Sequence, residues 1–89
     1  MISVEFAASL RRHVECPPQQ VAARDLRGAL EAALAAAAAL APYVFDDQHN
    51  VRKHVAVFIN QEMLRERTRL DQTLQDGDRV LVIQALTGG

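Results

Sequence analysis

Cysteine, glycine and excess charge are all scarce in this chain, and each scarcity removes a class of function. The one cysteine, Cys16, cannot form a disulfide within the chain, a four-cysteine zinc site or a four-cysteine iron–sulfur cluster. Only 4 glycines are present, and two of them stand at positions 88 and 89, so no glycine-rich phosphate loop can be built. The 10 basic and 11 acidic residues give a formal charge of -1, which argues against nucleic-acid binding driven by phosphate neutralisation.

Membrane signals are scarce as well. No apolar run reaches the roughly 18 residues that a membrane-spanning helix needs. Residues 1–20 lack a charged start followed by an apolar stretch, so no signal peptide is expected. We therefore expect a cytoplasmic protein that binds neither a membrane nor nucleic acid.

The apolar residues that are present suffice for one small core. Leu, Ile, Val and Phe make up 25 of the 89 residues, which is above the level of about 20% below which disorder is favoured. The length fits one domain. We expect a single domain over residues 1–86, followed by a flexible tail over residues 87–89.

Alternating apolar and polar residues predict five strands. The predicted strands are Met1–Ala7, Gln19–Ala23 at an edge, Val55–Asn60, Met63–Leu64 and Arg79–Leu86. In the last of these, Val80 and Val82 occupy one face, and Leu81 and Ile83 the other. A strand that is apolar on both faces is normally central, so we expect it to lie parallel to the first strand.

One helix is predicted between the second and third strands. Asp25 suits the N-cap position, where its carboxylate accepts hydrogen bonds from the first free N–H groups. Leu26, Leu30 and Leu34 then fall on one face. Pro42 is expected to end the helix after about 15 residues, because proline disfavours helical geometry in the residue before it.

The other segments are predicted to be connections. Pro42–His54 is a long polar loop and is therefore a candidate for function or mobility. Leu70–Leu74 predicts a helical turn, and Asp76-Gly77-Asp78 is a strong turn signal. The order of elements predicts an α+β fold in which a mixed sheet of four or five strands wraps around one main helix.

Histidines and paired carboxylates do not combine into a predicted catalytic or metal site. His13, His49 and His54 lack the spacing of metal ligands, so surface histidines are favoured. Asp46 and Asp47 are neighbours in a polar loop, where two carboxylates usually point apart into water. We therefore expect no metal site and no catalytic carboxylate pair.

Two other candidates give no catalytic site either. Cys16 is followed by Pro17, and no local feature would activate its thiol as a nucleophile. Arg65, Arg67 and Arg69 indicate a solvated edge rather than an anion site. Catalysis by this chain itself is not expected.

Gly88 and Gly89 at the C-terminus are the most distinctive feature of the sequence. They follow a strong strand rather than a low-complexity segment, which predicts an arm that projects beyond the sheet. Glycine has no side chain, so such an arm would fit a channel too narrow for other residues. Its reactive group is the α-carboxylate of Gly89, which needs activation, for example adenylation in the site of a partner. The alternative is a frayed end without function.

Several segments together resemble the MoaD/ThiS family of ubiquitin-like sulfur carriers. They are Met1–Leu10, the capped helix, Val55–Asn60, the turn Asp76-Gly77-Asp78 and the end Leu86-Thr87-Gly88-Gly89. The resemblance covers nearly the whole chain, and it implies the β-grasp fold. The first hairpin, in which Ser9–Pro18 connects the first two predicted strands, and the Pro42–His54 loop are most similar to the carriers of cysteine biosynthesis. The small subunit of molybdopterin synthase is also close.

The resemblance implies a carrier that is not an enzyme and that binds no cofactor. An ATP-using adenylyltransferase related to ubiquitin-activating enzymes would convert the Gly89 carboxylate to an acyl-adenylate, and a sulfur donor would displace AMP to leave a thiocarboxylate. The sulfur would then pass to an acceptor on a second biosynthetic enzyme. Gly88 would give clearance, while Thr87 and Leu86 would anchor the tail.

The resemblance also implies a partner-binding surface. Family members dock through the sheet face away from the helix, which here would carry Phe58, Leu81 and Ile83. Arg79 would pair with acidic residues of a partner. Alternatively, the three apolar residues form a homodimer interface or lie under a loop. Two other functions stay open: a protein modifier that forms isopeptides through Gly89, and a non-catalytic β-grasp adaptor.

Overall fold

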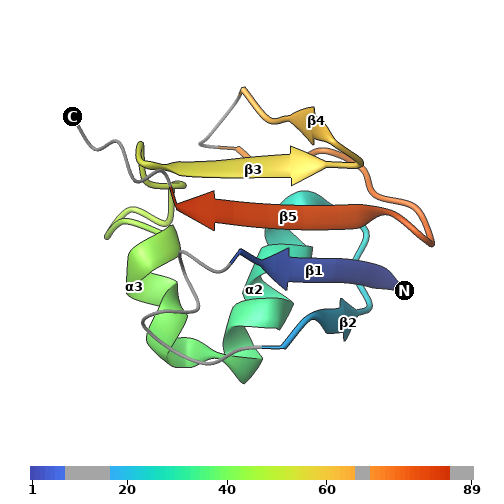
Figure 1. Cartoon of the computed structure of the whole chain (residues 1–89), viewed down its shortest axis with the longest axis horizontal. Coiled ribbons are helices and arrows are strands. Elements are labelled where there is room, and N and C mark those ends of the chain that lie inside the picture. Colours follow the sequence, from blue (N-terminus) through green and yellow to red (C-terminus); the bar gives the residue numbers. More distant parts are fainter. Residues whose placement is uncertain (8–16, 66–68, 85–89) are drawn as a thin grey trace.

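Five strands form one mixed sheet in the order β2-β1-β5-β3-β4 (Figure 1). The structure, a computed structural model, describes residues 1–7, 17–65 and 69–84. The strands are β1 (Ile2–Phe6), β2 (Gln19–Val21), β3 (Val55–Ile59), β4 (Glu62–Met63) and β5 (Arg79–Gln84). The central strand β5 is parallel to β1 and antiparallel to β3. The predicted mixed sheet, with its last strand beside its first and the second strand at an edge, is confirmed.

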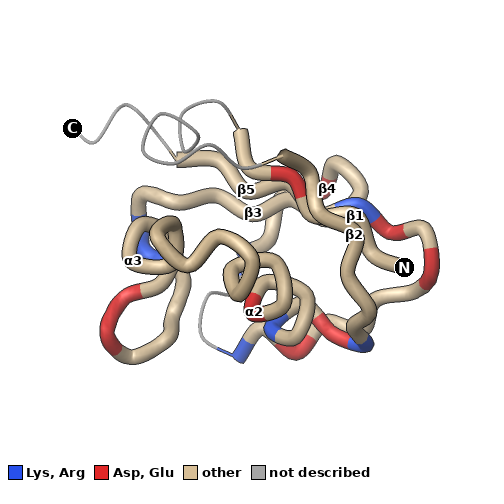
Figure 2. The backbone as a smooth tube through the Cα atoms, turned by 90° about the horizontal axis from the view of Figure 1, so that it is seen from below, with Lys and Arg blue, Asp and Glu red and all other residues tan. Residues whose placement is uncertain are grey.

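Period-two alternation gives the sheet one buried face. Ile2, Val4 and Phe6 of β1 are buried, and so are Val80 and Val82 of β5. The helices lie on this side of the sheet (Figure 2), so the core fills the space between them and the strands. The largest fully buried side chains are Phe6, Ile2, Leu26, Leu30, Leu40, Leu70, Val4, Val44, Val55, Val57 and Val80.

The main helix, α2 (Leu26–Ala36), begins at the predicted cap. Oδ1 of Asp25 accepts a 2.8 Å hydrogen bond from the N–H group of Gly28, which gives a partner to one N–H that the helix start leaves unpaired. A Cβ atom at Gly28 would lie 2.9 Å from this oxygen. Glycine in the first turn therefore leaves room for the capping carboxylate.

The prediction of one continuous helix as far as Pro42 is wrong. Helix α2 has 11 residues, and the backbone turns at Ala37, where φ is -138°. Two short helices follow, η1 (Ala38–Leu40) and α3 (Ala41–Val44). Pro42 lies in the first turn of α3, where its missing N–H group removes no helical hydrogen bond. The change of direction buries Leu40 and Val44 completely. In the described part of the chain, no helix is long and apolar enough to cross a membrane.

The Pro42–His54 segment is more ordered than the predicted polar loop. Helix α3 takes its first residues, and Phe45 and Val51 form an isolated antiparallel bridge. Both bridge residues are buried. Two apolar anchors thus hold the polar turn between them against the core.

The predicted helical turn at Leu70–Leu74 is wrong as well. This segment is irregular and runs along the start of α2, where the carbonyl groups of Leu70 and Gln72 accept hydrogen bonds from the first two residues of the helix at 2.9 and 3.0 Å. A helix leaves its first N–H groups without partners in its own backbone. The segment supplies those partners, and a helical turn would have used the same carbonyl groups internally.

Candidate functional site

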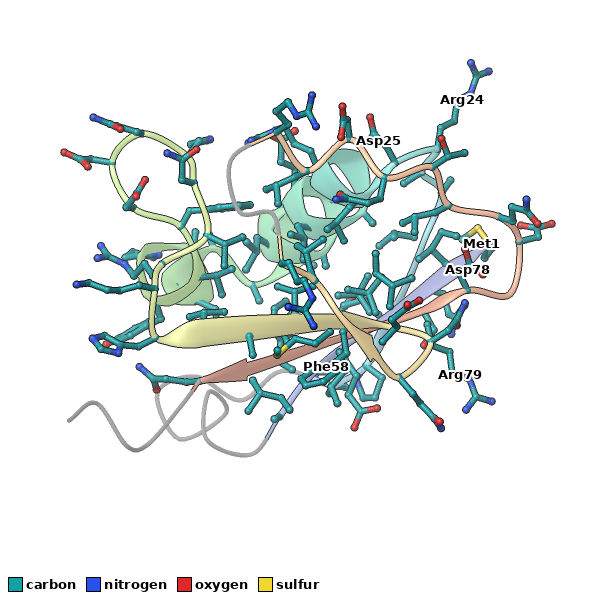
Figure 3. The ribbon with its side chains drawn as sticks, turned by 90° about the horizontal axis from the view of Figure 1, so that it is seen from above. Met1, Arg24, Asp25, Phe58, Asp78 and Arg79 are labelled. Carbon is teal, nitrogen blue, oxygen red and sulfur yellow. The ribbon has the colours of Figure 1, made fainter. Side chains whose placement is uncertain are left out.

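The sheet face opposite α2 carries no helix among the residues that the structure describes (Figure 2). On this open face, Phe58 of β3 is the direct cross-strand partner of Leu81 of β5, and Ala56 is the partner of Ile83. Residues directly opposed in an antiparallel pair share a face. Figure 3 shows Phe58 on the side of the sheet away from α2. The structure therefore brings Phe58, Leu81 and Ile83 together, each half-buried rather than fully exposed.

These side chains line an open hollow of about 620 Å³. Its lining residues are Ser3, Glu5, Phe58, Asn60, Gln61, Arg79, Val80, Leu81 and Ile83. The predicted Arg79 is exposed and pairs with Ser3 across β1 and β5, and Glu5 is exposed beside Leu81. One cation and one anion thus border an apolar centre. Sequence reasoning missed Glu5, although its place in β1 next to the buried Val4 indicates the open face.

Met63 extends the apolar part of this surface and was also missed. It lies opposite Phe58 in the β3–β4 pair, and 51% of its surface is exposed. The sequence placed Met63 in a short strand but did not fix the register of that strand. A two-residue turn at Asn60 and Gln61 fixes the register, because the length of a hairpin turn determines which residues face each other.

The turn formed by Asn60 and Gln61 also lines the hollow. Asn60 and Gln61 have φ values of 51° and 73°, the pair of positive values that a type I′ hairpin turn needs. Oδ1 of Asn60 accepts a 2.9 Å hydrogen bond from the N–H group of Arg79. Nδ2 of Asn60 donates a 2.9 Å hydrogen bond to Oδ1 of Asp78. The backbone of Arg79 is therefore fixed at the border of the hollow.

Asp78 joins this turn to two other segments (Figure 3). Its Oδ2 accepts a 2.8 Å hydrogen bond from the N–H group of Gln75, and its backbone carbonyl accepts one from β1 at 3.0 Å. The hydrogen bonds from Gln75 and then from Asn60 favour the carboxylate form, so the pKa of Asp78 is lowered. The predicted turn at residues 76–78 is confirmed, and Gly77 has a φ of 91°, which favours glycine.

The predicted tail residues Leu86, Thr87, Gly88 and Gly89 lie outside the described residues. The described part of β5 ends at Gln84, which pairs with Val55 at the start of β3. The last described residue of β5 therefore lies beside the loop that leads into β3 (Figure 1). The projecting arm stays a prediction.

The histidines and the cysteine are not gathered into a described site. His13 and Cys16 lie outside the described residues. The ring of His49 stacks on Phe45, with centroids 5.4 Å apart and an interplanar angle of 9°. Among residues 1–7, 17–65 and 69–84, no group of three or more His, Cys, Asp or Glu side chains is placed to hold a metal ion.

Asp46 stabilises its own loop. Its Oδ1 accepts hydrogen bonds from the N–H groups of Asn50 at 3.0 Å and Gln48 at 2.9 Å. The hydrogen bond from Asn50 is the largest cause of the lowered pKa of Asp46. Burial, the next largest effect, raises the pKa, and the N–H group of Gln48 and the charges of Arg52 and His49 each lower it further. These contacts account for the position and the lowered pKa of the Asp46 carboxylate, so neither points to a catalytic role.

Comparison with known proteins identifies the family of this chain from its sequence and its fold from similar solved structures. The chain matches the model of the ThiS family over residues 4–89. No curated protein sequence matches it significantly. SAMP1 from Haloferax volcanii has a similar structure, with a TM-score of 0.84 at 23% identity over 99% of this chain and 98% of that chain. The predicted β-grasp fold is confirmed by this likeness.

Two further similar structures are complexes. A chain in the BexX/CysO complex of Amycolatopsis orientalis superimposes with a TM-score of 0.82 at 18% identity, over 100% of both chains. A chain in the complex of subunits 1 and 2 of molybdopterin-converting factor from Helicobacter pylori gives 0.66 at 20% identity, over 99% of this chain and 97% of that chain. Proteins of this fold are thus found bound to protein partners.

Proposed function

The chain belongs to the ThiS family, and on that premise we propose that it is a sulfur carrier whose reactive group is the Gly89 carboxylate. Small carrier proteins of this family are not catalysts, in agreement with the expectation from the sequence. The observation that carries the proposal is the extent of the family match, which continues through Gly88 and Gly89.

The proposed cycle has three steps on the Gly89 carboxylate. An adenylyltransferase related to ubiquitin-activating enzymes joins the carboxylate to the AMP part of ATP and releases pyrophosphate. Hydrosulfide from a sulfur donor attacks the acyl carbon, AMP leaves, and a thiocarboxylate remains. Its sulfur then attacks an acceptor on a second enzyme and displaces a leaving group to form a thioester, and hydrolysis of the acyl–sulfur bond leaves the sulfur on the acceptor and restores the Gly89 carboxylate. The need for ATP is consistent with a cytoplasmic cycle.

The last residues have distinct proposed roles in this cycle. Glycine has no side chain, so Gly88 gives the tail the clearance to enter a narrow channel. Thr87 and Leu86 anchor the tail where it leaves the sheet. The reacting atoms belong to Gly89 alone, and ATP is bound by the activating enzyme rather than by this chain.

The open face of the sheet is the proposed docking surface for both partners. Phe58, Leu81 and Ile83 form its apolar centre in the hollow of about 620 Å³, and apolar surface of this kind is typical of interfaces. Arg79 at the border of the hollow would pair with an acidic residue of a partner. The neighbours found in complexes support a function that depends on protein partners.

We infer that the acceptor enzyme belongs to cysteine or cofactor biosynthesis. The support is the likeness to structures that contain CysO and molybdopterin-converting factor. In the sequence, the first hairpin and the Pro42–His54 segment favour the cysteine branch.

Pyrophosphate exchange tests the activation step. The purified chain is incubated with ATP, labelled pyrophosphate and each adenylyltransferase of this class from the same organism. The proposal expects exchange that depends on the chain and that is lost when Gly89 is deleted, while the thermal melting curve is unchanged. Exchange that survives the deletion, or no exchange with any of these enzymes, would contradict it.

A protein modifier is the second candidate, and the likeness to a small archaeal modifier protein favours it. In this case a lysine amine of a target protein attacks the same acyl-adenylate, AMP leaves, and an isopeptide bond forms. Immunoblots of cell lysate against the chain would then show a ladder of heavier species that disappears on deletion of Gly89. A single free band would exclude the modifier. An adaptor that uses only the open face would keep its function after that deletion.

A further inference from the structure

Leu81 lies at the centre of a cross of four side chains on the open face of the sheet. Along β5, Arg79 and Ile83 stand two residues before and after Leu81 and share its face, because side chains alternate along a strand. Across the strands, Glu5 of β1 and Phe58 of β3 are the direct partners of Leu81. Figure 3 shows Phe58 and Arg79 on the side of the sheet away from α2. The cross therefore has one charged and one apolar arm in each of its two directions.

The two charged arms have opposite signs and are available to a partner. Glu5 and Arg79 are both exposed. Neither side chain forms an ion pair with another residue that the structure describes. The apolar residues between them, Leu81, Phe58 and Ile83, are half-buried. The open face thus presents one anion, one cation and an apolar centre to whatever covers it.

This arrangement is complementary to itself about a two-fold axis. An axis that lies in the interface, passes through Leu81 and runs along the diagonal between Glu5 and Arg79 exchanges the strand direction with the cross-strand direction. It therefore places Glu5 of one copy against Arg79 of the other, and Phe58 against Ile83, in the reciprocal contacts of an isologous interface.

The spacings of the sheet permit this exchange. Neighbouring strands lie about 4.8 Å apart, and residues two apart in a strand are separated by about 6.8 Å. The difference of about 2 Å is small enough for the long side chains of Glu5 and Arg79 to absorb. The strands of the two copies then cross at a steep angle, close to the orthogonal arrangement that is one of the two usual ways in which sheets pack.

We propose that the open face binds a second copy of this chain in this arrangement, with two ion pairs between Glu5 and Arg79 beside an apolar centre. The charges specify the occupant, because the two-fold axis brings each charge to its opposite, whereas a face with charges of one sign would repel its own copy. An interface of one small sheet face should give a weak and reversible dimer. The dimer covers Phe58, Leu81 and Ile83, so an enzyme partner would have to displace the second copy, a consequence that rests on the proposed function.

Charge reversal at the two charged residues tests the pairing. Glu5→Arg and Arg79→Glu each bring like charges together in their own homodimers. When the two variants are mixed, each substituted residue meets the opposite charge on the other chain, so a heterodimer regains both ion pairs. The control for net charge is Glu31→Arg, because Glu31 is exposed on α2, which covers the other side of the sheet. Melting curves establish that the variants fold.

Sedimentation equilibrium of the chain alone, from about 0.01 to about 1 mM, measures the dissociation constant, which should fall in this range for the wild type. Glu5→Arg and Arg79→Glu should each weaken self-association about ten-fold or more, and their equimolar mixture should return close to the wild-type value, as should Glu31→Arg.

Three results would overturn the dimer: a wild-type chain that stays monomeric throughout, single variants that associate as well as Glu31→Arg, or a mixture that forms no heterodimer. These measurements contain no activating enzyme, so such a failure leaves the carrier function intact. Failure of the carrier function appears separately, as the absence of pyrophosphate exchange.

Discussion

Asn60 and Asp78 are joined by a 2.9 Å hydrogen bond from Nδ2 to Oδ1, which ties the β3–β4 turn to the start of β5. The second polar atom of the Asn60 side chain accepts from the N–H group of Arg79 at 2.9 Å. One side chain thus connects the two strands that carry most of the open face. The shape of the proposed docking surface depends on this connection.

Asn60→Ala should destabilise the protein. The substitution removes both side-chain hydrogen bonds and places alanine at a φ of 51°, with an expected loss of about 1–2 kcal/mol in the free energy of unfolding. Urea denaturation monitored by circular dichroism measures this change. Gln61→Gly is the matched control, because glycine suits the φ of 73°, and it should be neutral or stabilising by up to about 1 kcal/mol. Equal losses in the two variants would contradict the role assigned to Asn60.

The lowered pKa of Asp78 predicts how stability changes in acid. An aspartate whose pKa is lower in the folded protein stabilises the fold above the unfolded value of about 4, and this contribution is lost as the pH falls through the folded pKa. Asp46 contributes with the same sign. The urea midpoint of the wild-type chain should therefore fall between about pH 7 and about pH 2.5, and that of Asp78→Asn should fall less. An equal decrease in both proteins would show that Asp78 is not a source of the acid sensitivity.

Gly28→Ala should destabilise the helix that alanine normally favours. The new Cβ would lie 2.9 Å from Oδ1 of Asp25, so the capping carboxylate would have to move. Loss of an N-cap costs about 1 kcal/mol, which is similar to the gain that alanine brings over glycine within a helix. A double-mutant cycle separates the two effects: Gly28→Ala should stabilise the protein in an Asp25→Ala background and should not stabilise it in the wild type. Stabilisation of the same size in both backgrounds would show that the cap does not need glycine.

Phe58 is expected to matter for partner binding more than for folding. It is half-buried and lines the open hollow, and removal of an aromatic anchor from an interface typically costs about 2 kcal/mol or more in binding. Phe58→Ala should therefore weaken binding to the activating enzyme by about 30-fold, measured by calorimetry. Phe58→Leu keeps the apolar surface and should retain most of the affinity. Unchanged binding of Phe58→Ala would place the docking surface elsewhere.

The strands and their faces were predictable because the signal is local. Alternation in β1, β3 and β5 directly reflects which residues are buried, and the apolar character of both faces of β5 identified it as central. Alternation separated Leu81 and Ile83 from Val80 and Val82, and the family resemblance placed Phe58 with them on the open face. Glu5 and Met63 were missed because their proximity to these residues depends on strand pairing and register, which the sequence pattern does not specify.

The two wrong predictions both concern segments whose form is decided by packing. A run of alanines from Ala35 to Ala39 favours a helix at every position, so nothing local marks the turn at Ala37. The turn is favoured because it buries Leu40 and Val44. Residues 70–74 likewise take their form from the start of α2, whose free N–H groups need partners from a distant part of the chain.

The mass of the intact chain after activation is the most direct test of the central claim, that Gly89 carries sulfur. The chain is incubated with ATP, the activating enzyme and sulfide, and its mass is then measured. Replacement of one carboxylate oxygen by sulfur should add about 16 Da, and fragmentation should locate the added mass on Gly89. An unchanged mass under conditions in which pyrophosphate exchange proceeds, or a shift that persists after deletion of Gly89, would contradict the account.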